Sequence, residues 1–436
     1  MKNMKSFAIL ILLSLNQIYA QYSLPPAIMD SIRDIDRSLS SDRNYIAALT
    51  RLNRIHAMPQ YAGQPILFNH LGLYNSLVSD YSTAVAFFDS IELLRQSQRH
   101  TTSLPPTGLT FDTSQIRPFP AMETILRLAK NNSVVMINER HHMPMHRAFI
   151  LELLIRLKAL GYTHYAAEGL QNHDTITSPA TYPAIGKTGY YVNESVFGEL
   201  IRTAILLGYK IVAYETTSSA SPESDPIKNQ NKREKEQAEN LYNKTLRQDP
   251  HCKVLVHVGY GHNDKMGVGG WIPMASYFKT ISGVEPLSID QIEMFEHRVP
   301  YFENPYYRFI SGMISQPSVF IENSSNTFWS YLQRGSYDLE ICHPKETYVH
   351  GRPTWRNIAN RYRMYDLPIS KKTIAKGLLQ AFYHDEPSDA VPADQIVFNT
   401  GVQQMIPCLF LQPGKYRFKL VSEDSTISTE WVDIIK

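Results

Sequence analysis

Cysteine is scarce in this sequence, which excludes a fold held together by disulfides. Three cysteines occur among 436 residues, at Cys252, Cys342 and Cys408. They are too few for a disulfide scaffold, and their number is odd. They also lie far apart, without the short spacing that is typical of a cysteine metal site. We therefore expect buried or free thiols.

An excess of charge of either sign is missing as well. The 43 Lys and Arg residues nearly balance the 41 Asp and Glu residues, and no long basic run occurs. The balance gives no reason to expect a nucleic-acid partner or binding to an anionic membrane surface. A small molecule or a peptide is the expected partner, and the sequence leaves the oligomeric state open.

Two common catalytic motifs are also absent. There is no G-x-S-x-G sequence, which argues against a serine nucleophile of the α/β-hydrolase type. There is no compact H-E-x-x-H sequence, which argues against the usual zinc protease helix.

The N-terminus has the features of a secretory signal peptide. Met1–Ala20 carries Lys2 and Lys5, an apolar run from 7 to 15, and small residues at its end. That run is too short to span a membrane, and no cysteine follows it for a lipid anchor. We expect an exported protein, periplasmic or extracellular, with no transmembrane segment in the mature chain.

The rest of the sequence divides by its hydrophobic pattern. A helical pattern with prolines comes first, and Gly72, Tyr74, Ala84 and Phe88 resemble one tetratricopeptide-type helix pair. The next region alternates short apolar strands with helices, and the last fifty residues alternate apolar and polar positions. The predicted divisions are a signal peptide at 1–20, a helical region at 21–115, an α/β domain at 116–384 and a small antiparallel β module at 385–436.

Strand and helix alternate most regularly in the α/β domain, which predicts a mostly parallel sheet with helices on both faces. The pattern also favours a helix at Lys372–Tyr383 and a long insertion at Gln171–Asn193, a candidate substrate loop or lid. The strands are expected at Val134–Ile137, His164–Ala167, Lys210–Tyr214 and Lys253–Val258, and the helices at Pro144–Leu160, Glu194–Leu207 and Lys232–Leu246.

The stretch from Ser133 to Arg147 contains the first group of candidate site residues. A buried strand is followed at once by Glu139, His141 and His142, and then by a helix that begins at Pro144. Ligands bind at this edge of open parallel sheets. His146 faces the start of the helix, where it also fits the role of a simple cap. One carboxylate and two or three imidazoles at this turn indicate chemistry.

The other strands end in polar residues of the same kind. Glu168, Glu215 and the segment Gly259–His262 each follow a strand, so parallel strands would bring them to one edge. Arg233 begins a polar stripe on a later helix, although a solvated surface helix would show the same stripe. Tyr260 could ligate, stack or pack, Glu215 also fits an N-cap, and His164 and His257 are expected to be packed.

Together these motifs resemble the superfamily of erythromycin-esterase-like, ChaN-like and Tiki-like proteins, over 116–291. The erythromycin-esterase pattern Gly-Glu-x-x-His matches Glu139 and His142, and the ChaN pattern Gly-Glu-x-His matches Glu139 and His141, with His146 as its later histidine. Asn138 replaces the leading glycine. The remaining matches are Glu168, His262 and the helix sequence Arg233-Glu234-x-x-Gln237-Ala238-x-Asn240.

The leading hypothesis is a hydrolase without a covalent intermediate. His142, oriented by a carboxylate such as Glu139, would be the general base that activates water. Glu168 would hold the water or tune the histidine, and Arg233 and His262 would stabilise the oxyanion. The resemblance to the esterase branch implies an ester or lactone substrate, and an amide carbonyl would react in the same way.

Two alternatives use a cofactor at the same edge. Glu139, His142 (or His141), Glu168 and His262 offer the mixed nitrogen and oxygen ligands that Zn²⁺ or Mn²⁺ accepts, and the Tiki-like relatives imply metal-dependent proteolysis. The ChaN-like relatives imply haem or iron binding, for which Tyr260, His262, His141, His142 and His146 are candidate ligands. The sequence does not decide between no cofactor, a divalent metal and haem.

Overall fold

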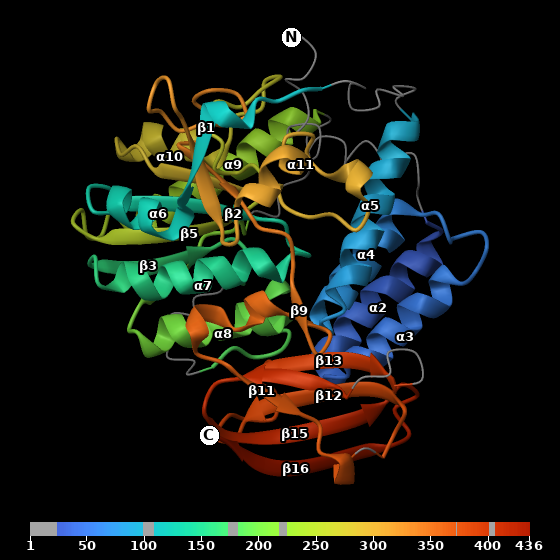
Figure 1. Cartoon of the computed structure of the whole chain (residues 1–436). Helices are drawn as coiled ribbons and strands as arrows, with labels where there is room; N and C mark the ends of the chain where they lie inside the picture. The colour runs from blue at the N-terminus through green and yellow to red at the C-terminus, as the bar shows by residue number, and fades with distance from the viewer. Residues whose placement is uncertain (1–23, 99–108, 173–181, 218–224, 372, 401–405) are drawn as a thin grey trace.

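We describe a computed structural model of the chain (Figure 1). It describes residues 24–98, 109–172, 182–217, 225–371, 373–400 and 406–436. The expected signal peptide lies outside the described residues. Helices at the N-terminus, a central α/β part and an antiparallel β sheet at the C-terminus follow one another along the chain, which confirms the predicted fold class.

The N-terminal helices pack as consecutive antiparallel neighbours around one apolar core. They are α2 (Pro26–Asp42), α3 (Tyr45–His56), α4 (Pro65–Leu77) and α5 (Tyr81–Gln98). At the crossing of α4 and α5, Gly72 leaves room for a ring, since a Cβ there would lie 2.5 Å from a ring carbon of Phe88. The predicted small-and-aromatic helix pair is therefore α4 with α5.

The central sheet contains eight strands in the order β1-β7-β8-β6-β2-β5-β3-β4 among the described residues. Every pair from β8 to β4 is parallel, and β1 and β7 are antiparallel at one end. The strands are β1 (Ile116–Pro120), β2 (Val134–Glu139), β3 (Tyr162–Ala167), β4 (Lys210–Ala213), β5 (Lys253–Gly259), β6 (Leu287–Met294), β7 (Ser318–Glu322) and β8 (Leu339–Cys342).

Helices cover both faces of this sheet, as expected for parallel strands that are apolar on both sides. α6, α7 and α8 share one core with alternate residues of the strands, such as Ile137 and Leu255. α9 and α10 share the opposite core with the intervening residues, such as Met136 and Val256. The helices are α6 (Ala121–Ala129), α7 (Pro144–Lys158), α8 (Ser195–Leu206), α9 (Pro226–Lys244), α10 (Met274–Ser282) and the short α11 (Tyr307–Ile310).

The C-terminal part is an antiparallel sheet in the order β13-β12-β15-β16 (Figure 1). It packs against the N-terminal helices through Leu378, Val391 and Val421. Two short strand pairs, β9 with β10 and β11 with β14, precede and flank it. These strands are β9 (Tyr348–Val349), β10 (Arg352–Pro353), β11 (Arg363–Asp366), β12 (Lys376–Tyr383), β13 (Asp394–Asn399), β14 (Cys408–Leu411), β15 (Gly414–Ser422) and β16 (Ser428–Ile435).

Two expectations for this part are wrong. The predicted helix at Lys372–Tyr383 is β12, which lies between β13 and β15. Because β12 is an inner strand of the sheet, the β module begins before 385, and the acidic stretch Asp385–Asp394 leads from one strand to the next. Leucine, alanine and glutamine favour a helix locally, but burial between two neighbouring strands decides the outcome.

Single turns of 3-10 helix connect the larger elements. They are η1 (Thr113–Gln115), η3 (Tyr191–Asn193), η4 (Pro300–Phe302), η5 (Ser311–Met313), η6 (Thr354–Arg356), η7 (Ile358–Asn360) and η8 (Ile369–Lys371). Among the helices of the described ranges, none combines the length and the apolar character needed to cross a bilayer.

Candidate active site at the sheet edge

Three adjacent parallel strands deliver the predicted polar residues to one edge of the sheet. β5 lies between β2 and β3, with Glu139 opposite Gly259 in the register. Glu168 follows β3 directly, and its backbone N–H donates to the carbonyl of His257 on β5. The turn after β5 carries His262. The expected meeting of these residues at a common edge is therefore present.

Glu139 is buried at the end of β2, and Arg147 donates to both of its oxygens. Its Oε2 accepts from Arg147 Nε at 2.6 Å, and its Oε1 accepts from Arg147 Nη2 at 2.8 Å. His257 Nε2 lies 2.9 Å from Oε2. Burial alone would raise the pKa of Glu139, but the charges of Arg147 and then His257 outweigh it and hold the pKa well below its usual range. Glu139 is thus an ionised carboxylate.

His141 is the histidine that Glu139 orients. Its Nδ1 lies 2.8 Å from Glu139 Oε1, and because an ionised carboxylate only accepts, Nδ1 must carry the hydrogen. The ring stacks on Tyr191 with centroids 3.9 Å apart and meets the edge of Tyr260 at 5.2 Å. In a neutral ring this arrangement leaves Nε2 with a free lone pair. The side chain is 13% exposed, so it is reachable from solvent.

Gly259 allows the imidazole and a second carboxylate to approach each other. A Cβ at Gly259 would lie 2.7 Å from His141 Nε2 and 2.9 Å from Glu168 Oε2. Such distances are shorter than a real Cβ contact, so any larger residue would push the two groups apart. Glu168 Oε2 instead accepts from the N–H of Gly259 at 2.6 Å. The bare backbone of Gly259 therefore forms the floor between His141 and Glu168.

Arg233 on α9 connects Glu168 to a second carboxylate, that of Glu215. Its Nη2 donates to Glu168 Oε1 and to Glu215 Oε2, each at 2.6 Å. Gln237, one turn further on, donates to both oxygens of Glu215. The polar stripe of α9 thus faces the site, and Glu215 is part of it. Nε of Arg233 also donates to Glu215 Oε1 at 3.1 Å, and Nη1 lies 3.4 Å from His262 Nε2, while the side chain remains 30% exposed.

His262 lies between two carboxylates. Its Nδ1 lies 2.7 Å from Glu234 Oε2, and its Nε2 lies 3.4 Å from Glu168 Oε1. Burial alone would lower the pKa of His262, but Glu168 and Glu234 raise it to about 10. Burial would raise the pKa of Glu168, but His262 and then Arg233 hold it well below its usual range. At neutral pH His262 is therefore an imidazolium and cannot act as a base.

His142 points away from this site, which corrects its expected pairing with Glu139. Its ring stacks on Phe88 of α5, with centroids 3.5 Å apart and planes 7° apart. Burial, with a smaller contribution from Arg140, holds the pKa of His142 well below its usual range. The residue anchors the N-terminal helices to the turn after β2. Of the two adjacent histidines, the structure places His141 at the sheet edge and His142 in this anchor.

The residues predicted as haem ligands do not lie together around one space. His146 is fully buried, and its Nδ1 accepts from the backbone N–H of Arg140 at 3.1 Å. Its ring lies against Phe295 and His343, whereas Tyr260 lies against His141. His146 therefore caps the turn, as the simpler interpretation proposed, and does not share a space with His141 and Tyr260.

The predicted metal ligands do not fit an ion. Both oxygens of Glu139 are occupied by Arg147 and His141, and His142 faces away. Within the described part of the chain, the one group of ligand atoms that lie close enough to share an ion is elsewhere and contains none of these residues. No step is therefore assigned to a metal at the sheet edge.

Several residues of the site were not predicted. Arg147 is buried on α7, where a lone arginine within an apolar helix face is the signal that could have identified it. Tyr191 lies in the long insertion and has no local signal. His257 was expected to be packed, and it does lie in a strand, but its ring nitrogens face Glu139 and Tyr165. Glu234, expected only as a motif position, holds His262.

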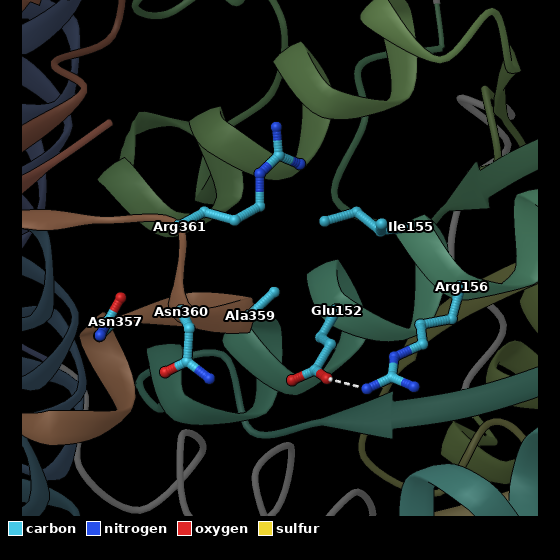
Figure 2. Close-up of a pocket in the computed structure, with 7 residues that line it drawn as sticks. All are labelled: Glu152, Ile155, Arg156, Asn357, Ala359, Asn360 and Arg361. Atoms are coloured by element: carbon cyan, nitrogen blue, oxygen red, sulfur yellow. Dashed lines mark hydrogen bonds and ion pairs between the residues drawn. The ribbon is translucent and has the colours of Figure 1, made fainter. Parts of the chain in front are cut away.

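A separate cavity lies further along α7. It has a volume of about 480 Å³ and opens to the surface beside η7. Figure 2 shows Arg361 and Ile155 on opposite sides of it, with the ion pair of Glu152 and Arg156 beside them. None of the predicted site residues lines this cavity.

Comparison with known proteins places this chain near no family. No model of a known family and no curated protein matches it. Among solved structures, the type III effector HopBA1 aligns with 54% of this chain and 99% of its own, at 14% identity and a TM-score of 0.31. RRSP, a MARTX toxin effector domain from Vibrio vulnificus, aligns with 50% of this chain and 44% of its own, at 19% identity and a TM-score of 0.29. At these TM-scores the likeness is partial and does not establish a shared fold.

Proposed function

We propose that this protein is a hydrolase in which His141, oriented by Glu139, activates water to attack an ester, lactone or amide carbonyl. The observation that carries the proposal is the 2.8 Å contact between His141 Nδ1 and Glu139 Oε1. It fixes the tautomer that leaves Nε2 as the proton acceptor. A carboxylate that orients a histidine through Nδ1 is the arrangement that makes imidazole an effective base in hydrolytic triads.

His141 both accepts the proton of the attacking water and returns it to the leaving group. His141 Nε2 takes a proton from water as the oxygen attacks the carbonyl carbon, and the imidazolium then gives this proton to the departing alkoxide or amine. Glu139 stays ionised throughout because Arg147 faces it. The carboxylate stabilises the positive charge that forms on His141 during attack.

Arg233 and His262 are assigned the stabilisation of the negative charge that develops on the carbonyl oxygen. Arg233 is partly exposed and His262 is held protonated, and Glu168 contacts both. Since these charges are fixed before the reaction, they stabilise an oxyanion without reorganisation. Glu168 positions them and keeps its oxygens turned toward Gly259 and Arg233.

The adjacent histidines provide a matched test of this proposal. Turnover of ester, lactone and peptide substrates should fall by about 10²- to 10⁴-fold in His141→Ala, the usual contribution of a general base. His142→Ala should retain turnover while lowering thermal stability, because it loses only the stack on Phe88. Circular dichroism would confirm that both variants fold. Full activity in His141→Ala, or no turnover of any of the three carbonyl classes by the native protein, would contradict the proposal.

Membership of the superfamily of erythromycin-esterase-like, ChaN-like and Tiki-like proteins stays a prediction, as do export and the identity of the substrate. The contacts of the two histidines favour one of the two motif spacings on which that resemblance depends. Glu139 with His141 follows the spacing Glu-x-His, whereas the spacing Glu-x-x-His leads to His142, which faces α5. Metal-dependent proteolysis and haem binding are not proposed, because the residues predicted for them are occupied or apart.

A further inference from the structure

A second cluster of chemically active side chains lies far from the sheet edge, where the central part meets the C-terminal β module. His350, Asp366 and Cys408 place an imidazole nitrogen, a carboxylate oxygen and a sulfur within 4.8 Å of one another. The first two, His350 Nδ1 and Asp366 Oδ1, are 3.2 Å apart. None of these residues belongs to the proposed catalytic site.

The fold builds this cluster from two paired strands and the turn of a neighbouring hairpin. Asp366 ends β11 and is the direct register partner of Cys408, which begins β14. Directly opposed residues of an antiparallel pair project from the same face of the sheet. His350 is at the tip of the β9–β10 hairpin, and the Cys408 thiol donates to the His350 carbonyl at 3.8 Å. The hairpin tip is thus held against the β11–β14 pair.

The backbone at the hairpin tip is in the left-handed conformation. His350 has φ of 46° and Gly351 has φ of 71°, so two left-handed residues connect β9 to β10. A two-residue turn of this kind prefers Asn or Asp followed by Gly, and histidine is one of the few other residues enriched at positive φ. In this conformation the imidazole lies next to Asp366 and remains about half exposed to solvent.

We propose that His350, Asp366 and Cys408 form a binding site for a borderline-soft divalent cation such as Zn²⁺. One thiolate, one imidazole and one carboxylate are ligands that Zn²⁺ accepts, and a water would complete a tetrahedron. Tetrahedral zinc separates such donor atoms by about 3.3–3.6 Å, as its bond lengths require. The His350–Asp366 separation of 3.2 Å is already close to that range, and the Cys408 sulfur, within 4.8 Å of both, would have to move closer to them.

The exposure of the three residues fits a site that a cation can enter. The His350 and Asp366 side chains are each about half exposed, and the Cys408 side chain closes the inner end. An exposed ion pair alone is worth little. Binding would displace the thiol proton and join the hairpin to the β module, so the cation would stabilise the contact between them.

The direct probe is Co²⁺ alone, added to the full chain purified with a chelator and then freed of it. The expected result is one equivalent bound, with the visible bands of tetrahedral Co²⁺, a sulfur-to-cobalt charge-transfer band, and displacement of both by Zn²⁺. His350→Ala and Asp366→Asn change exposed side chains, so both should fold. Each should weaken binding by more than about 100-fold, since even residues that only orient a metal ligand are worth about 10- to 100-fold.

Matched controls separate this site from other thiols and histidines. Cys408→Ser should abolish the charge-transfer band, whereas Cys252→Ala and His251→Ala should leave it unchanged. Zn²⁺ should raise the thermal unfolding midpoint of the native chain and leave that of His350→Ala unchanged. Absence of the band in the native chain, or the same affinity in His350→Ala and Asp366→Asn, would overturn the proposal.

Discussion

The two halves of the central sheet hold buried carboxylates in opposite states. At the ends of β2 and β3, Glu139 and Glu168 face Arg147, Arg233 and His262, and the pKa of each carboxyl lies well below its usual range. On β6 and β8 the buried acids are Asp290, Glu293 and Glu340. Burial raises the pKa of all three, and that of Asp290 reaches about 7.

The difference comes from the partners, since burial is similar in both halves. Asp290 and Glu340 are register partners on adjacent strands, and the charge of Asp290 adds to burial in raising the pKa of Glu340. The charge of Glu293 in turn adds to burial in raising the pKa of Asp290. One oxygen of each of the three acids accepts no hydrogen bond from the described residues, and Glu293 has a long ion pair with Arg140, at 3.9 Å from Nη2. A cation placed by the fold thus decides whether a buried acid of this sheet serves as an anion or holds a proton.

Removing the cation from the first half should have the largest effect. Arg147→Ala leaves Glu139 buried without its main partner, and we expect the free energy of unfolding to fall by about 3–5 kcal/mol. Arg156→Ala, on the exposed side of the same helix, should change it by less than about 0.5 kcal/mol. Chemical denaturation of both variants measures the contrast. Equal stability of the two variants would show that Arg147 does not compensate Glu139.

Removing a buried acid from the half of the sheet formed by β6 and β8 should instead increase the free energy of unfolding. The pKa of Asp290 is about 7 in the folded chain and ordinarily about 3.8, so its contribution to stability is complete below about pH 3.8 and is lost as the pH rises through 7. Asp290→Asn should therefore raise the free energy of unfolding by about 1–3 kcal/mol at about pH 8.

The pH profile provides the control for that variant. At about pH 3.5, where most of an unfolded chain's aspartate is already protonated, Asp290→Asn should nearly match the native chain. Between these limits the native stability should fall more steeply with pH than that of the variant. A destabilised variant at high pH, or parallel profiles, would mean that Asp290 is ionised in the folded chain.

The sequence was sufficient for the sheet and for most of the site. Short apolar strands that each end in a polar residue predicted that Glu139, Glu168 and His262 would meet, because parallel strands end at one edge. Arg233 was predicted separately, from a polar stripe on a later helix that a solvated surface helix would also show. β12 was not predictable in this way. Its residues favour a helix, and only the two strands that cover it in the folded chain make it a strand.

The choice between His141 and His142 also depended on distant parts of the chain. Both follow the same strand, and both match a spacing from Glu139. The ring of His142 stacks on Phe88, which lies more than fifty positions earlier in the sequence. The ring of His141 stacks on Tyr191, which lies about fifty positions later. Neither contact has a signal in the local sequence, so the orientation of the turn could not be read from it.

The most direct test of the contrast is to measure both kinds of carboxyl in one sample. Carbon-13 NMR of the side-chain carboxyls at about pH 5.5, above the usual pKa of an aspartate or glutamate, separates the two states. We predict an ionised Glu168 and a protonated Asp290 in the same folded chain. An ionised Asp290, or a protonated Glu168, would contradict the account of how this sheet sets its charges.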